Sequence, residues 1–306
     1  MGNWGTSLYA GDFAADLRST IRAVVRLPFD PDRLADIIGD TEPGAATDSD
    51  DEDYTTFWLV LADQFARYGL KSRRVLDTAV EIIDSGRDLD VQRRLGQRAA
   101  GLRARSRILA ALRDRLTNPQ KPAARRVVGR PEPFVFDAGE ALAYPTCGGR
   151  CRNPYAADLG RLKIYGPKGG KVWTQDGWGA VAIVERGRAF EYFAWYRPLV
   201  VRVGFAERPG LRELNDSEWQ LQLPGTCSRS HYRRMAFARV GEVKVSLETL
   251  KRCVADRREW GRGDRSAIAD ISIANRLRVV PFGAAPGSSP SGRIGGIVVR
   301  LDELAP

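Results

Sequence analysis

"TNPQKPAARRVVGRPEP", residues 117–133, separates two parts of the chain with different hydrophobic periodicities. Proline and cations dominate this stretch, and such a composition is typical of a linker. Before it, apolar residues recur at helical spacing, whereas after it they fall in short runs that are typical of strands. We therefore predict an α+β protein with a helical domain at residues 1–118, a linker at 119–133 and a β-rich domain at 134–306.

The first 118 residues predict five helices with apolar faces. Their expected ranges are from about Asp12 to Val25, 30–39, 53–69, 72–85, and from about Leu89 to Leu116. Residues 53–69 are apolar nearly all round, so we expect this helix at the centre of the helical domain. The acidic stretch "TEPGAATDSDDED", residues 41–53, has no apolar period and is expected to be a solvated loop.

The chain beyond the linker predicts strands, because its short runs are rich in valine and aromatic residues and are bounded by glycine, proline or aspartate. Examples are "EALAYP" (140–145), "WGAVAIVER" (178–186), "RAFEYFAWY" (188–196) and "PLVVRVGF" (198–205). A single helix is expected at "SLETLKRCVADRREWG" (246–261). The rear part should therefore be a predominantly antiparallel, barrel-like β domain with one inserted helix.

The composition, 43% apolar and 28% charged, is typical of a soluble globular protein. No apolar run approaches the roughly 20 residues of a membrane span, and the first residues lack the features of a secretion signal. We expect a cytoplasmic protein without membrane association. Thiols stay reduced in that compartment, so a disulfide framework built from the 4 cysteines is not expected.

The net charge of +10 is distributed unevenly. Residues 1–90 contain 9 cations and 18 acids, whereas residues 91–130 contain 12 cations and 1 acid. A basic segment of this kind favours contact with nucleic acid, an acidic lipid surface or an acidic protein. The alternative is that its cations cover the acidic segment of the same chain.

Two sets of side chains are candidates for a nucleic-acid or partner surface. The first lies on the last predicted helix, and comprises Arg93, Arg94, Arg103 and Arg107. The second lies among the aromatic residues of the β domain, and comprises Arg186, Arg188, Trp195 and Arg197. Arginine and tryptophan on an exposed face can stack on bases or anchor a protein partner. The alternatives are that the arginines form a solvated helix face and that the rings fill the core.

Two short-spaced pairs predict a structural zinc site. Cys147 and Cys151 form one pair, and Cys227 forms the other with His231, the only histidine in the chain. Three thiolates and one imidazole are a ligand set that tetrahedral zinc accepts. Two alternatives remain open: the thiols are ordinary core or surface residues, or one of them is a nucleophile that His231 activates. Cys253 is a spare thiol that could replace the histidine.

Two stretches resemble known bacterial families. "MGNWGTSLYAGDFAAD" (1–16), with the later "FWLVLADQFARYGL" (57–70), resembles the start of an uncharacterised domain family that begins with a WG…D.A.D pattern, and the resemblance covers residues 1–118. Residues 135–146, with "FDAGEALAYPT", are similar to the opening strand of a β-rich immunity-protein family that accompanies polymorphic toxins. This chain has Glu140-Ala141 where that family's pattern has Asp-Val. The resemblance implies a partner-binding or self-protection role.

No firm catalytic constellation emerges from the sequence. We therefore expect a non-enzymatic partner-binding protein, of immunity or defence type, that uses the arginine and aromatic surface of the β-rich domain. The first alternative is a nucleic-acid-binding protein with a basic helix and a structural zinc site. The second is a cysteine-dependent enzyme.

Overall fold

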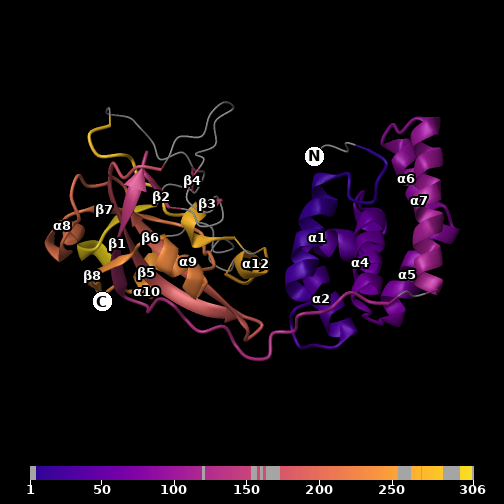
Figure 1. The fold of residues 1–306 in the computed structure, drawn as a ribbon, viewed down its shortest axis with the longest axis horizontal. Coiled ribbons are helices and arrows are strands. Elements are labelled where there is room, and N and C mark those ends of the chain that lie inside the picture. The colour runs from indigo at the N-terminus through magenta and orange to yellow at the C-terminus, as the bar shows by residue number, and fades with distance from the viewer. Residues whose placement is uncertain are drawn as a thin grey trace. The chain divides into compact units, whose positions relative to one another are not determined.

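The chain is α+β, as predicted, with helices first and an antiparallel sheet after them (Figure 1). The computed structural model describes residues 5–118, 121–152, 157–158, 161–162, 173–253, 263–269, 271–284 and 297–304. Its contacts divide the chain into two compact units, Met1–Arg130 and Pro131–Pro306, which we name the helical unit and the β unit. None of the helices in the described ranges has the length and apolarity that crossing a membrane requires.

The helical unit is built around one apolar helix. Its elements are α1 (Asp12–Val24), α2 (Pro31–Thr41), α3 (Pro43–Thr47), α4 (Tyr54–Tyr68), α5 (Arg73–Asp84), α6 (Arg87–Arg94) and α7 (Ala99–Thr117). Helix α4 packs against α1 on one side and against α5 and α7 on the other (Figure 1). Its side chains from Phe57 to Ala62 are all buried, as its apolar sequence predicts. Gly69, with φ of 67°, ends the helix in the left-handed conformation that glycine adopts without strain.

Two local predictions in this unit are wrong. The helix expected from Leu89 to Leu116 is two helices, because the chain turns between them at Gly96, where φ is 85°. The turn leaves Leu95 50% exposed, although helical spacing placed it inward. In addition, α3 forms inside the stretch expected to be a solvated loop.

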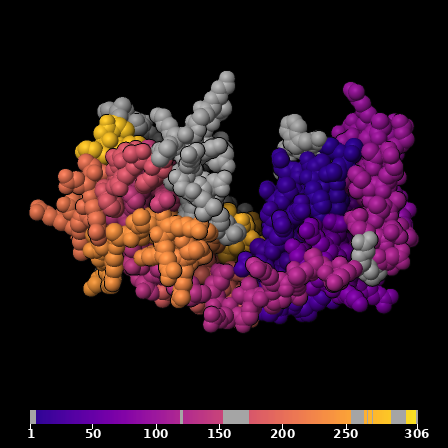
Figure 2. Space-filling view, viewed as in Figure 1, coloured from indigo at the N-terminus to yellow at the C-terminus, as the bar shows by residue number. Residues whose placement is uncertain are grey.

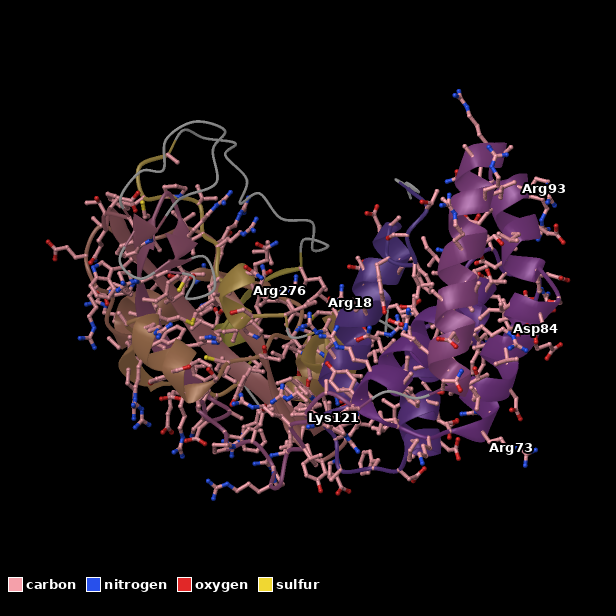
Figure 3. All side chains as sticks on the ribbon, turned by 45° about the vertical axis from the view of Figure 1, so that its right-hand side comes forward. Arg18, Arg73, Asp84, Arg93, Lys121 and Arg276 are labelled. Carbon is pink, nitrogen blue, oxygen red and sulfur yellow. The ribbon has the colours of Figure 1, made fainter. Side chains whose placement is uncertain are left out.

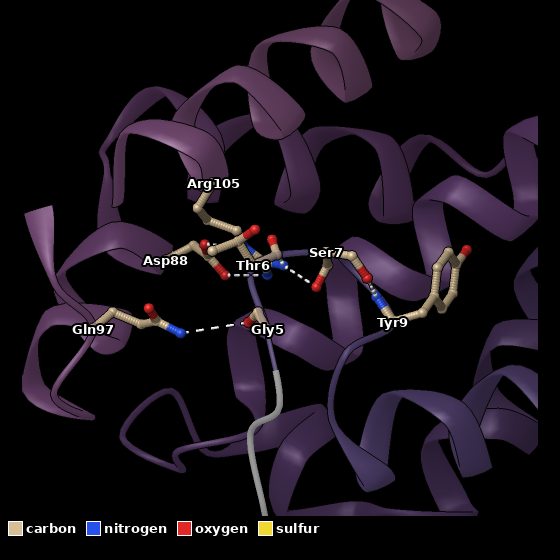
Figure 4. A network of polar contacts seen from close by, with 7 residues as sticks. All are labelled: Gly5, Thr6, Ser7, Tyr9, Asp88, Gln97 and Arg105. Carbon is tan, nitrogen blue, oxygen red and sulfur yellow. Dashed lines mark hydrogen bonds and ion pairs between the residues drawn. The ribbon is translucent and has the colours of Figure 1, made fainter. Parts of the chain in front are cut away.

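A buried ion pair joins α6, α7 and the start of the chain (Figure 4). Arg105 donates two hydrogen bonds to Asp88, each of 2.9 Å, and the side chains are 6% and 0% exposed. A third bond of 2.9 Å runs from the same guanidinium to the carbonyl oxygen of Ser7. Nearby, Gln97 donates to the carbonyl oxygen of Gly5 at 3.4 Å. Arg105 belongs to the basic segment 91–130, but its buried guanidinium makes it a structural residue.

Residues 121–130 of the predicted linker contain no helix or strand and lie along the surface of the helical unit (Figure 2). Arg125 donates to the carbonyl oxygens of Val25 and Leu27, at 2.6 and 2.5 Å, just beyond the end of α1. The backbone N–H of Ala123 donates to the carbonyl oxygen of Arg67 at 2.8 Å. The stretch is therefore attached to the helices, although its composition suggested a free linker.

The β unit contains an open antiparallel sheet. Its strands are β1 (Glu140–Cys147), β2 (Arg150–Cys151), β5 (Gly177–Ala189), β6 (Phe193–Val201), β7 (Glu218–Leu221), β8 (Ala238–Glu242) and β9 (Val298–Arg300). The order is β2-β1-β5-β6-β7-β9, with β8 also paired to β1, and β3 (Ala157–Asp158) with β4 (Arg161–Leu162) forms a separate ribbon. The sheet does not close, so the expected barrel-like form is wrong.

Several short helices, rather than one, interrupt the strands of this unit. They are α8 (Leu211–Asn215), α9 (Arg229–Arg234), α10 (Leu247–Cys253), α12 (Gly263–Ile268) and the 3-10 turns Ile273–Asn275 and Asp302–Leu304. The helix expected at 246–261 is present as α10, and its remaining part, 254–261, lies outside the described residues.

The run "RAFEYFAWY" is not one strand, because β5 and β6 meet in a hairpin inside it. Phe190 and Glu191 form the turn, with positive φ values of 49° and 69°. Ala189 consequently lies opposite Phe193, and the alternation of side chains restarts there. Pro198 lies inside β6, whereas the sequence placed it at the start of a new strand. The pairing register of β5 shifts beside Pro198, between Ile183 and Glu185, and this irregularity accommodates the missing N–H donor of the proline.

We expect Arg105→Ala to destabilise the helical unit by about 3–5 kcal/mol, because it leaves the carboxylate of Asp88 buried without a countercharge. Arg103→Ala, two residues away on the exposed side of α7, is the matched control and should change the free energy of unfolding by less than about 0.5 kcal/mol. Urea unfolding monitored by circular dichroism measures both. Equal effects would show that the buried pair contributes nothing specific.

The acidic stretch before α4 predicts a pH dependence. Burial, followed by the neighbouring Glu52, Asp51 and Glu42, raises the pKa of Asp53 to about 6. Because the unfolded chain has the lower pKa, stability falls as pH rises from about 4 to 6 and stays lower above that range. We expect Asp53→Asn to raise the melting temperature at pH 7.5 and to leave it unchanged near pH 3.5. Asp50→Asn, at an exposed position of the same stretch, serves as the control.

Candidate functional site

The hairpin that joins β1 and β2 carries two of the four residues of the predicted zinc site, Cys147 and Cys151. Gly148 and Gly149, with φ values of 57° and 70°, form its two-residue turn. Thr146 lies opposite Cys151, and Cys147 lies opposite Arg150. Because neighbouring residues of a strand point to opposite faces, Cys147 and Cys151 are on opposite faces of the hairpin.

Cys151 and Cys227 are buried members of the core of the β unit, 5% and 6% exposed. Burial raises the pKa of Cys227 to about 12, and burial, followed by the nearby Cys227, raises that of Cys151 further. Each thiol donates to the backbone carbonyl of the next residue, at 3.6 Å. A thiol that burial keeps protonated is a poor nucleophile, so these contacts do not favour cysteine catalysis.

The described residues contain no group of three or more His, Cys, Asp or Glu side chains arranged to hold a metal ion. His231 lies on the short α9, where its backbone N–H donates to Ser228 at 3.3 Å. Cys147 is half-buried and Cys253 is exposed. Within the described residues, the two pairs are therefore not seen gathered as one ligand set. Zinc binding stays a prediction.

Arg186 and Arg188 hold a segment of their own unit. Their guanidinium carbons lie 4.4 and 4.0 Å from the ring centre of Phe134. Arg186 also donates to the carbonyl oxygen of Phe136 at 3.0 Å, and Arg188 donates to that of Glu132 at 3.1 Å. These contacts fix residues 132–136 across one face of the β5–β6 hairpin. The two arginines are exposed, but their charged groups are already engaged.

Arg197 and Trp195 lie on the other face of that hairpin. Arg197 is 2% exposed and its Nε lies 2.9 Å from Oε2 of Glu185. Trp195 is half-buried and its ring covers Gly187, where an added Cβ would come within 2.4 Å of it. The sequence placed both on an exposed recognition surface. For Arg197 that placement is wrong, because its guanidinium is inside the unit.

The arginines of α6 and α7 divide into paired and unpaired groups. Arg93 pairs with Asp90, Arg113 with Asp84 and Arg115 with Asp63. These pairs agree with the view that part of the basic segment covers the acidic one.

Four exposed arginines have no carboxylate within ion-pair distance in the described chain, and we name them the α6–α7 arginine surface: Arg94, Arg98, Arg103 and Arg107. Arg107 donates only to the carbonyl oxygen of Arg103, at 3.4 Å. Helix α7 rises about 1.5 Å per residue, so the positions from Arg98 to Arg107 span about 14 Å. Residues of α6 and α7 form one edge of the helical unit in Figure 2.

Sequence reasoning missed an open groove of about 880 Å³ in the same unit. Its apolar lining includes Phe65, Leu70, Val75, Leu76, Leu116 and Pro122. The apolar spacing of the predicted helices indicated Phe65, Val75, Leu76 and Leu116 as core. The groove forms where the ends of α4, α5 and α7 meet, and the local sequence pattern of each helix does not predict how these ends are arranged.

Comparison with known proteins yields no match, whether by family model, among curated proteins or among solved structures.

The thiols predict a simple pattern of chemical reactivity. At a pKa of about 12, Cys227 carries on the order of 10³-fold less thiolate at pH 7 than an ordinary cysteine. We expect a maleimide to modify Cys253 and, more slowly, Cys147 in the folded protein, and Cys151 and Cys227 only after unfolding. Mass spectrometry of the labelled peptides locates the modified residues. Full protection that a chelator removes would instead support zinc.

Proposed function

We propose that this chain is a non-enzymatic binding protein whose α6–α7 arginine surface docks on an acidic partner protein. The observation that carries the proposal is the set of four exposed arginines for which the described chain supplies no carboxylate. The likeness of residues 135–146 to immunity proteins supports a partner-neutralising role. We place the surface on the helical unit because Arg186, Arg188 and Arg197, the arginines of the candidate surface in the β unit, are engaged or buried.

The chemistry of the surface suits a protein interface. Arginine is enriched at the energetic centres of interfaces, where its planar group binds carboxylates through two hydrogen bonds. Leu95, 50% exposed, lies in the turn that carries Arg94 and Arg98, and supplies an apolar contact beside the charges. A partner with carboxylates around an apolar patch would complement this arrangement.

A second candidate function is binding to nucleic acid. Arg103 and Arg107 lie one helical turn apart on the exposed side of α7, a spacing that places their guanidinium groups beside one another. Such a pair can contact neighbouring phosphates without reading bases. The lack of aromatic residues in α6 and α7 favours backbone contact over stacking on single strands.

The test compares three forms of the full chain as bait in an extract of the source organism. They are the wild type, a variant with all four surface arginines changed to glutamine, and a control with Arg22→Gln and Arg33→Gln in α1 and α2. We expect one acidic protein to be retained by the wild type and the control. Its loss from the four-arginine variant should be at least about tenfold, because removing hydrogen-bonded interfacial charges costs about 2 kcal/mol or more.

Two results would decide against this proposal. Equal retention by all three forms would exclude the arginine surface as the docking site. Retention that nuclease treatment abolishes would favour the second candidate, and a DNA duplex should then bind with an affinity that falls steeply with salt.

A further inference from the structure

The groove of the helical unit lies between three helix ends. Its floor comes from the last turns of α4, including Phe65, and its walls come from the start of α5 and the end of α7. Pro122 closes one side, packed so tightly on Gly69 that an added Cβ would lie 2.8 Å from it. The volume of about 880 Å³ is within the range of small-molecule sites, roughly 300–1,000 Å³.

Aliphatic side chains dominate the apolar lining. Val75 and Phe65 are buried at 2% exposure, whereas Leu76 remains 37% exposed on the wall. Elsewhere in the described helical unit, the only other large apolar side chains with comparable exposure are Leu95 and Val127. Binding of a hydrocarbon chain in an aliphatic groove of this kind is favourable, because it removes apolar surface from water.

The rim of the groove is cationic. Its lining includes Lys71, Arg73 and Arg115 and one acid, Asp77. Arg115 is matched by Asp63 at 2.6 Å, and Arg73 contacts Asp77 at 3.3 Å with both side chains largely exposed. Such an exposed pair is weak and can exchange partners. Lys71 makes no ion pair within the described part of the chain, so its charge is available.

We propose that this groove binds a long-chain aliphatic carboxylate, with the hydrocarbon chain along Leu76 and Val75 and the carboxylate at Lys71 and Arg73. The aliphatic lining selects the chain, and the cationic rim selects an acidic headgroup over a neutral or cationic one. The first turn of α5 adds partial positive charge beside Arg73. The site is independent of the proposed docking function: Arg73, at the groove, and Arg93, beside the arginine surface, lie at opposite ends of the unit (Figure 3).

The experiment is the displacement of a fluorescent fatty acid from the full chain by three competitors of equal chain length. They are a monomeric carboxylate, the primary alcohol and the alkyltrimethylammonium ion. We expect saturable binding in the micromolar range, with the carboxylate at least tenfold more effective than the alcohol and the cation least effective.

Paired variants locate the site. Leu76→Glu and Lys71→Glu should each weaken binding at least tenfold, the first by placing charge on the apolar wall and the second by reversing the rim charge. Val127→Glu, at an apolar side chain of 47% exposure outside the groove, and Arg22→Glu on α1 are the controls and should bind within twofold of the wild type. Thermal melting by circular dichroism verifies that every variant is folded.

Several outcomes would overturn the proposal. One is no saturable binding of the monomeric carboxylate below about 100 µM; another is equal displacement by the cationic amphiphile. Binding only to anionic vesicles would indicate a membrane surface instead, and binding only of an acidic amphipathic peptide would indicate a protein segment. A negative result here leaves the arginine-surface test unaffected, because the two tests change different residues.

Discussion

The buried pair of Arg105 and Asp88 is the interaction on which the helical unit depends. It joins the consecutive helices α6 and α7 to the chain segment at Ser7, 98 residues before Arg105, at one point inside the unit. Two charges buried together cost free energy to desolvate, and the bidentate geometry and third hydrogen bond offset that cost. The pair also fixes which side of α7 faces inward, and therefore which of its other arginines face solvent.

The order and type of the elements could be read from the sequence wherever periodicity is strong. The apolar stretch 53–69 became the central α4, and the short apolar run "WGAVAIVER" became part of β5. The predicted element boundaries were wrong where the conformation of one or two backbone positions decides whether a helix or strand continues. Gly96, with a positive φ, divides a stretch whose apolar spacing predicted one continuous helix. Phe190 and Glu191 form a turn with positive φ values, which are uncommon for residues other than glycine and are therefore not expected from the sequence. The open sheet depends on strand pairing over long separations, which local patterns do not contain.

The candidate sites were less predictable than the fold, because side chains of one type have different roles. Arg105 and Arg103 are two residues apart and equally polar, yet one is buried and bonded while the other is exposed. Likewise, both Arg186 and Arg197 were predicted to lie on an exposed recognition surface. Arg197 is instead buried beside Glu185, and the guanidinium of Arg186 packs on the ring of Phe134. The spacing of Cys147 and Cys151 matched a metal ligand pair, but strand alternation separates their side chains.

A cationic side chain binds a partner most readily when it does not already bond to groups of its own chain. The candidate surfaces can be compared by this criterion. In the β unit, Arg186, Arg188 and Arg197 each bond to their own unit, so a ligand would have to replace existing contacts. On α6 and α7 the surface arginines face no such competition from carboxylates of the described chain. The same criterion separates Lys71 from Arg115 at the groove, since only the second is matched by a nearby acid. Among the candidate surfaces, the α6–α7 arginine surface and Lys71 at the groove meet this criterion, and neither hydrophobic periodicity nor residue type alone distinguishes them.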